Sequence, residues 1–228
     1  MLGESRGNER VPYRQTERSE RVRAATRDKI LRAARKLFVQ RGFAATSMDA
    51  IVKLAGTSIG NLYFYFENKE ALLATLSEMA LRAAWARGDE LMAAVPAGPA
   101  RVAAMVYANA YGLMVTDRDI LQIMLAAERL LPVRDHIVEL NMARVRAILQ
   151  ENLPAYAARD LDLAASAWSG AARYLFEQAM SDGRLNATPT RLAEYTVRWN
   201  LRALRVPERD IDKAVAAAER ALAAHTRK

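Results

Sequence analysis

The stretch from Ser58 to Lys69 gathers side chains that form hydrogen bonds with polar or charged partners and places aromatic rings between them. It carries hydroxyl, amide, phenol and ammonium groups, which bind anions and polar edges rather than break covalent bonds. Four aromatic residues in a row, from Tyr63 to Phe66, lie in its middle. A surface helix buries one stripe, and the four-residue spacing puts Leu62 and Phe66 on that stripe. We therefore expect Tyr63 and Phe64 to point away from the core.

Residue sets typical of catalysis or metal binding do not stand out in this sequence. It has no cysteine, which excludes disulfides and thiolate chemistry, and its two histidines, His136 and His225, form no convincing metal site. We find no Ser-His-Asp order, no Gly-rich phosphate loop and no close carboxylate pair. We therefore expect a protein that is not an enzyme and that uses no cofactor and no metal.

Composition favours helix, and charge is concentrated near the N-terminus. Hydrophobic residues make up 52% of the chain, and Ala and Leu dominate them over β-branched types. Residues 1–70 carry 14 Lys and Arg against 8 Asp and Glu, a net +6 of the total +8. This indicates a polyanionic partner for the first third, or else a solvated basic tail. The apolar run of residues 102–115 is too short to span a bilayer, and residues 1–30 are strongly polar, so we expect a cytoplasmic protein.

Capping residues predict four helices in the first third. Residues 1–25 alternate Arg and Glu without apolar periodicity and indicate a disordered basic arm. Helix starts and stops are then predicted at Thr26, Gly42, Thr46-Ser47, Gly56, Ser58 and Asn68. Two short helices around a tight glycine turn match the spacing of a helix-turn-helix, in which the second short helix enters the DNA major groove.

This arrangement explains the exposed aromatic residues. Ser58, Ile59 and Asn61 occupy the N-terminal positions that come nearest to base edges. Tyr63 can place its hydroxyl on phosphate, and Lys69, in the first turn of the next helix, can bind another phosphate. The alternative is that the tyrosines are half-buried packing residues and that Lys69 is a surface charge.

Several ordered segments carry a resemblance to the TetR family of bacterial transcription repressors over roughly residues 26–76. They are Ala33-Ala34-Arg35-Lys36-Leu37-Phe38, Arg41-Gly42-Phe43, Thr46-Ser47-Met48 with Ile51, Ala55-Gly56-Thr57-Ser58, Leu62-Tyr63-Phe64-Tyr65-Phe66 and Asn68-Lys69-Glu70-Ala71-Leu72.

The resemblance implies a helical homodimer whose N-terminal domain binds an operator in double-stranded DNA and whose C-terminal domain binds a small-molecule effector. By position it assigns DNA contacts to Thr46, Ser47, Ser58, Ile59, Asn61, Tyr63, Phe64, Tyr65 and Lys69. Ile59 departs from the family, which often has Lys, Arg or a small polar residue there. Because isoleucine cannot form a side-chain hydrogen bond, we expect it to touch a thymine methyl group.

The C-terminal half offers residues for a ligand cavity and for dimerisation. Methionines and tyrosines around a few polar groups typically line an apolar ligand cavity, and equally form an ordinary helical core. The ligand-contacting set we predict is Met105, Tyr107, Tyr111, Met114, Met124, Glu128 and Asn141. By analogy with the family, two later helices pair with their mates in a four-helix bundle; intramolecular packing is the alternative. The predicted interface is Trp168, Ala171, Leu175, Leu192, Tyr195 and Trp199.

The sequence thus predicts an all-α protein of about nine or ten helices. Residues 1–25 form the arm, 26–72 a three-helix helix-turn-helix domain, and 73–228 a larger effector-binding and dimerisation domain. The predicted function is a ligand-responsive regulator, a repressor that binds a palindromic operator as a dimer and is released by its effector. The alternative is a helical ligand-binding or scaffold protein without operator binding.

Overall fold

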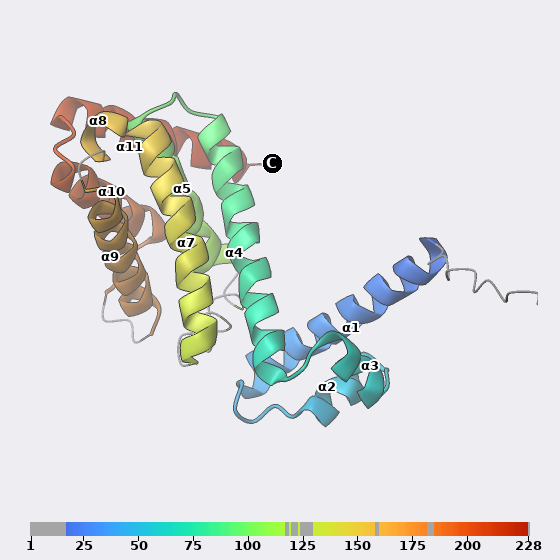
Figure 1. Cartoon of the computed structure of the whole chain (residues 1–228). Helices are drawn as coiled ribbons and strands as arrows, with labels where there is room; N and C mark the ends of the chain where they lie inside the picture. The colour runs from blue at the N-terminus through green and yellow to red at the C-terminus, as the bar shows by residue number, and fades with distance from the viewer. Residues whose placement is uncertain are drawn as a thin grey trace, which may run out of the picture.

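The computed structural model describes residues 17–116, 119, 123, 130–157, 160–181 and 185–227. Within these ranges every regular element is a helix, which confirms the all-α prediction. Figure 1 shows two parts: a small N-terminal lobe made of α1, α2 and α3, and a larger helical body. Helix α4 begins in the lobe and continues into the body, so it carries the chain from one part to the other.

The N-terminal lobe, which we call the head, comprises α1 (Glu17–Arg41), α2 (Met48–Ala55), α3 (Ile59–Tyr65) and the start of α4 (Lys69–Ala93). Its core is a single cluster in which fully buried side chains from each of these helices meet, among them Ile30, Ile51, Leu62 and Leu72. Helices α2 and α3 are each too short to be stable alone, so α1 and α4 supply the apolar surface that holds them.

The predicted helix boundaries around the turn are confirmed. Ser47, Ser58 and Asn68 are N-caps whose side chains accept a hydrogen bond from the backbone N–H three residues later. Gly56 ends α2 in the left-handed conformation, with φ of 63°. Only glycine adopts this conformation without steric cost, so Gly56 sets the sharp turn between α2 and α3.

The first helix is longer than the sequence predicted. It begins at Glu17 rather than at Thr26, so residues 17–25, which we assigned to the disordered arm, are helical. Arg, Glu and Ala are strong helix formers, and their propensity extends a helix without an apolar stripe. The remainder of the predicted arm, residues 1–16, lies outside the described residues.

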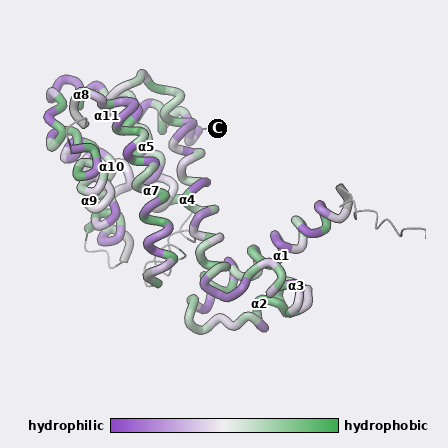
Figure 2. Tube along the Cα trace, viewed as in Figure 1, coloured by the Kyte–Doolittle hydropathy of each residue, from purple (hydrophilic) through white to green (hydrophobic). Residues whose placement is uncertain are grey.

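The body is a bundle around α5 (Pro99–Tyr111), whose side chains from Val102 to Ala108 are all buried. Helices α4, α10 (Pro189–Ala203) and α11 (Glu208–His225) pack against α5. The other elements are the π-helix η1 (Gly112–Thr116), α7 (Leu131–Asn152), α8 (Pro154–Ala157) and α9 (Leu161–Ser181). Figure 2 shows hydrophobic stretches along α5 and more polar ones along α7.

Candidate nucleic-acid interface

Helix α3 presents an exposed aromatic and aliphatic face. Leu62 and Phe66 are 0% and 3% exposed, so they anchor the helix on the head as the spacing predicted. Tyr63 and Phe64 on the opposite side are 54% and 68% exposed, and Ile59 is 41% exposed. Tyr65 is half-buried and meets the ring of Phe64 edge-on, with 4.9 Å between ring centroids. An outward face this apolar on so short a helix is suited to contact with another molecule.

Exposed hydrogen-bonding groups surround this face. The hydroxyl oxygens of Ser47 and Ser58 accept from the N–H groups of Ala50 and Asn61, both at 3.2 Å. Each hydroxyl keeps its own proton for donation to an outside acceptor. The side-chain amide of Asn61 donates to the Thr57 hydroxyl at 3.1 Å, which orients it while leaving it exposed.

Thr46 does not lie on this surface, contrary to the prediction. The residue is 2% exposed, and its hydroxyl donates to the carbonyl oxygen of Gly42 at 2.8 Å. This hydrogen bond joins the two ends of the loop between α1 and α2. We therefore leave Thr46 out of the proposed interface.

The Lys69 side chain also turns inward. Its ammonium donates to the carbonyl oxygens of Phe43 at 2.7 Å and Thr46 at 2.9 Å, with Ala44 at 3.4 Å. It also lies 4.3 Å from the centroid of the Phe43 ring. The predicted phosphate contact therefore competes with bonds inside the head.

Two arginines on α1 lie over aromatic rings of the α3 segment. The guanidinium of Arg23 is 6.0 Å from the Phe64 ring centroid, and that of Arg27 is 5.6 Å from the Phe66 ring centroid. Both residues are exposed, and they add positive charge beside α3. Arg27 was not singled out from the sequence. The four-residue spacing of the two arginines was the available signal.

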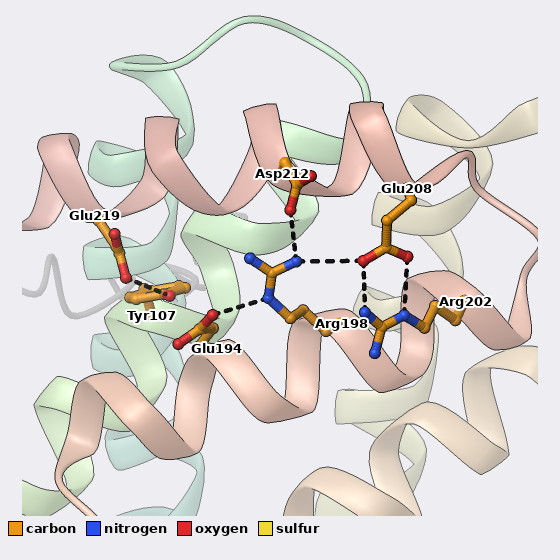
Figure 3. Close-up of polar contacts among 7 residues, drawn as sticks. All are labelled: Tyr107, Glu194, Arg198, Arg202, Glu208, Asp212 and Glu219. Atoms are coloured by element: carbon orange, nitrogen blue, oxygen red, sulfur yellow. Dashed lines mark hydrogen bonds and ion pairs between the residues drawn. The ribbon is translucent and has the colours of Figure 1, made fainter.

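In the body, the predicted ligand-contacting residues that the structure describes differ in burial. Met105 and Tyr107 are 8% and 0% exposed and belong to the packed core. Figure 3 shows the Tyr107 hydroxyl against the Glu219 carboxylate, to which it donates at 3.1 Å. Burial, with the neighbouring Glu219 charge, raises the pKa of Tyr107 well above its ordinary value. Tyr111, Met114 and Asn141 are half-buried, and Met124 and Glu128 lie outside the described residues.

A surface cleft of about 650 Å³ lies elsewhere, between the C-terminal ends of α4 and α11. Its lining is Glu90, Leu91, Ala93, Ala94, Val95, Pro96, Ala217, Arg220, Ala221, Ala224 and His225. None of the predicted ligand-contacting residues belongs to this lining.

The residues predicted for the dimer interface divide into three groups by their burial. Trp168 and Leu192 are 7% and 4% exposed, so they are core residues of a single chain. Ala171 and Leu175 are half-buried. Tyr195 and Trp199 are 60% and 48% exposed on α10. On α9, Leu163 and Tyr174 are 71% and 60% exposed, and neither was in the predicted interface set.

A network of charged side chains joins α10 to α11, as Figure 3 shows. The guanidinium of Arg198 contacts three carboxylates: Asp212 at 2.7 Å, Glu194 at 2.8 Å and Glu208 at 3.4 Å. Hydrogen bonds to Asp212 and Glu194 raise the pKa of Arg198 above its ordinary value. Arg202 donates to Glu208, which lowers the pKa of that carboxyl. The network links α10, which carries the exposed Tyr195 and Trp199, to the start of α11.

In the described part of the chain, no three His, Asp or Glu side chains come together in a way that could hold a metal ion. No helix there is both long enough and apolar enough to cross a membrane.

The geometry therefore defines an all-helical protein with an N-terminal helix-turn-helix head. Residues 30–76 match the model of the bacterial regulatory proteins of the tetR family. The match identifies the head as a helix-turn-helix region of the tetR type.

Curated relatives match in the same region. The transcriptional regulator QacR of Staphylococcus aureus is 50% identical over 46 residues, which are 20% of this chain and 24% of that protein. The chain spans between a quarter and a third of the length of the first curated relatives that it matches. These relatives are described as transcriptional regulators, not as enzymes.

Solved structures match over most of the chain. The regulator FadR of Bacillus subtilis, in complex with stearoyl-CoA, aligns with a TM-score of 0.61 and 19% identity over 76% of this chain and 97% of its own. RolR in complex with resorcinol aligns with a TM-score of 0.62 and 22% identity over 88% of this chain and 96% of its own. At this identity the likeness shows a shared fold.

Proposed function

We propose that this protein is a DNA-binding transcriptional regulator that works as a homodimer on a two-part operator. The observation that carries the proposal is the outward face of α3, where Ile59, Tyr63 and Phe64 are exposed although the helix is anchored firmly by Leu62. The second helix of a helix-turn-helix lies in the major groove and reads bases with its N-terminal residues. The match of residues 30–76 to the tetR family model supports this assignment.

The proposed interface combines backbone and base contacts. Ser47 and Ser58 donate their hydroxyl protons to phosphate, and Tyr63 donates from its phenol. Ile59 and Asn61 face the base edges, where isoleucine favours a thymine methyl group and asparagine favours adenine. The rings of Phe64 and Tyr65 pack at the rim. The exposed Arg23 and Arg27 add electrostatic attraction.

Dimerisation supplies the second reading head. The exposed stripe of Leu163, Tyr174, Tyr195 and Trp199 on α9 and α10 is apolar and aromatic, as a buried interface requires. Gly170 on α9 has open space around it, which permits close approach of a second helix. Two heads related by a two-fold axis fit inverted half-sites about one or more DNA turns apart, about 34 Å per turn.

We further propose that the protein binds a small-molecule effector. Residues 26–72 form the DNA-binding domain, and the chain from residue 73 onward forms the domain that binds the effector and dimerises. FadR and RolR are described in complex with stearoyl-CoA and resorcinol. We infer that an effector bound in the body shifts the spacing of the two heads and releases a repressor from its operator. A regulator of this kind acts in the cytoplasm, where the bacterial chromosome lies.

The test is selection of DNA from a pool of random duplexes, followed by gel-shift measurement. We expect the wild-type protein to enrich inverted half-sites. Ile59→Glu, which puts a carboxylate on the exposed start of α3, should abolish enrichment. Val138→Glu is a matched control, since Val138 is 47% exposed on α7. If the wild-type protein enriches no sequence, the chain is a helical ligand-binding or scaffold protein without operator binding. A thermal-shift screen of metabolites then tests the effector independently.

A further inference from the structure

Lys69 is the first residue of α4, and its ammonium is held entirely by the loop that precedes α2. Three carbonyl oxygens, from Phe43, Ala44 and Thr46, lie within 3.4 Å of Nζ. The Phe43 ring covers the ammonium at 4.3 Å. An ammonium has three N–H donors and no acceptor, so these three carbonyls use its full hydrogen-bonding capacity.

Apart from the Lys69 ammonium, the loop is supported by the Phe43 ring, which lies 5.3 Å from the Phe38 ring and packs on the head core, and by two internal hydrogen bonds. Between Gly42 and Ser47, the Thr46 N–H donates to the Phe43 carbonyl at 3.3 Å, and the Thr46 hydroxyl donates to Gly42. Ala44 and Ala45 are exposed and contribute only methyl groups. A positive charge bound to several carbonyls is a stronger constraint than a neutral hydrogen bond. Lys69 is therefore a main determinant of the loop conformation.

That loop places the first residue of the proposed DNA-contacting set. It ends at Ser47, the N-cap of α2, and α2 packs beside α3 in the head core. Lys69 thus joins the start of α4 to the start of α2 without passing through α3. Helix α4 continues into the body, so a change in its direction acts on the loop through this ammonium.

We propose that Lys69 is a positioning residue that locks α2 to the N-terminus of α4 and so sets the orientation of the reading head, rather than a phosphate contact. The inference rests on the proposed DNA-binding function, because it assigns a role within that site.

Two substitutions separate the positioning role from a phosphate contact. Lys69→Met keeps an unbranched side chain, one bond shorter, but removes the charge and all three donors. Lys69→Gln removes the charge but keeps two N–H donors on a chain one bond shorter. Lys53→Met is the matched control, because Lys53 is an exposed lysine of the same head. The DNA probe is the duplex selected by the wild-type protein, and an unselected duplex reports non-specific binding.

For Lys69→Met we expect about a tenfold or greater loss of affinity for the selected duplex, the factor that one charge-assisted hydrogen bond supplies. Affinity for the unselected duplex and the slope of log affinity against log salt should match those of the wild-type protein. Lys69→Gln should recover part of the specific affinity. If Lys69 contacts phosphate instead, Lys69→Met should lower the affinity for both duplexes by the same factor and reduce the salt slope by about 1. In that case Lys69→Gln should not restore affinity.

Amide hydrogen exchange tests the same idea without DNA. Backbone amides of residues 43–51 should exchange faster in Lys69→Met than in the wild-type protein, and glutamine should restore part of the protection. Unchanged exchange in Lys69→Met overturns the positioning role. A wild-type protein that binds no duplex overturns the proposed function instead, and the exchange experiment still decides the role of Lys69.

Discussion

The dimer surface gives the sharpest prediction, at Trp199. The residue is 48% exposed in the single chain. An aromatic side chain offers about 150–250 Å² for burial, so roughly 70–120 Å² of Trp199 remains for a partner to cover. At about 25 cal/mol per Å², covering it contributes about 2–3 kcal/mol for each subunit, or about 4–6 kcal/mol for both copies of a two-fold interface. This corresponds to about three to four powers of ten in the dissociation constant.

Trp199→Glu loses this contribution and adds an unpaired carboxylate to the interface, so it should convert the dimer to monomer. Sedimentation velocity across a concentration series measures the change, and circular dichroism checks that each subunit stays folded. A monomer has one recognition helix, so affinity for the selected duplex should drop towards the non-specific level. Ala223→Glu, at an exposed position of α11, is the control and should stay dimeric. A Trp199→Glu protein that remains dimeric and binds the duplex normally refutes the reasoning.

Three further predictions concern the N-terminal segment, Tyr107 and Glu78. Deletion of residues 1–22 should weaken DNA binding at low salt without unfolding the protein. The reason is the loss of five positive charges, those of Arg6, Arg10, Arg14, Arg18 and Arg21. Equal DNA affinity before and after the deletion would mean that the segment is only a solvated tail. Tyr107→Phe removes only the buried hydroxyl that donates to Glu219. It should lower the free energy of unfolding of the body by about 1 kcal/mol in a denaturant titration and leave the DNA affinity unchanged. Hydrogen bonds from Arg82 lower the pKa of Glu78 from its ordinary 4.5, so the carboxylate stabilises the folded state at neutral pH. This contribution is lost as the pH falls below about 4.5. The difference in melting temperature between the wild-type protein and Glu78→Gln should therefore shrink over that range, and a constant difference would exclude the contribution.

Local rules predicted the head well because its helices are bounded by residues with one physical role. A cap such as Ser58 satisfies a backbone N–H three residues ahead, and Gly56 adopts a conformation that other residues rarely reach. Both effects act within a few residues, so the sequence is sufficient to locate them. The start of α1 was wrong because Arg and Glu extend a helix by propensity without leaving an apolar stripe to read.

Contacts between distant residues were not predictable in the same way. Lys69 and Phe43 are separated by 26 positions, and no local pattern indicates that the lysine turns towards the loop instead of towards solvent. Two of the tryptophans illustrate the same limit. Trp168 and Trp199 both lie on amphipathic helices, yet Trp168 is buried inside the chain and Trp199 is half exposed. Which side of a helix is buried within the chain depends on where the neighbouring helices lie, and the sequence of one helix does not show their positions.

Helix α4 shows why the body can influence the head at all. Its first turns contribute Leu72, Leu73 and Leu76 to the head core, and its later residue Leu91 belongs to the body core. Two side-chain pairs link it to α7: Glu78 with His136 in the middle of α4, and Asp89 with Arg144 near its C-terminal end. Because one continuous helix belongs to both cores, α7 cannot move past α4 without either breaking these pairs or carrying α4 along. In the second case the N-terminus of α4 moves within the head, and the Lys69 ammonium transmits that movement to the loop before α2.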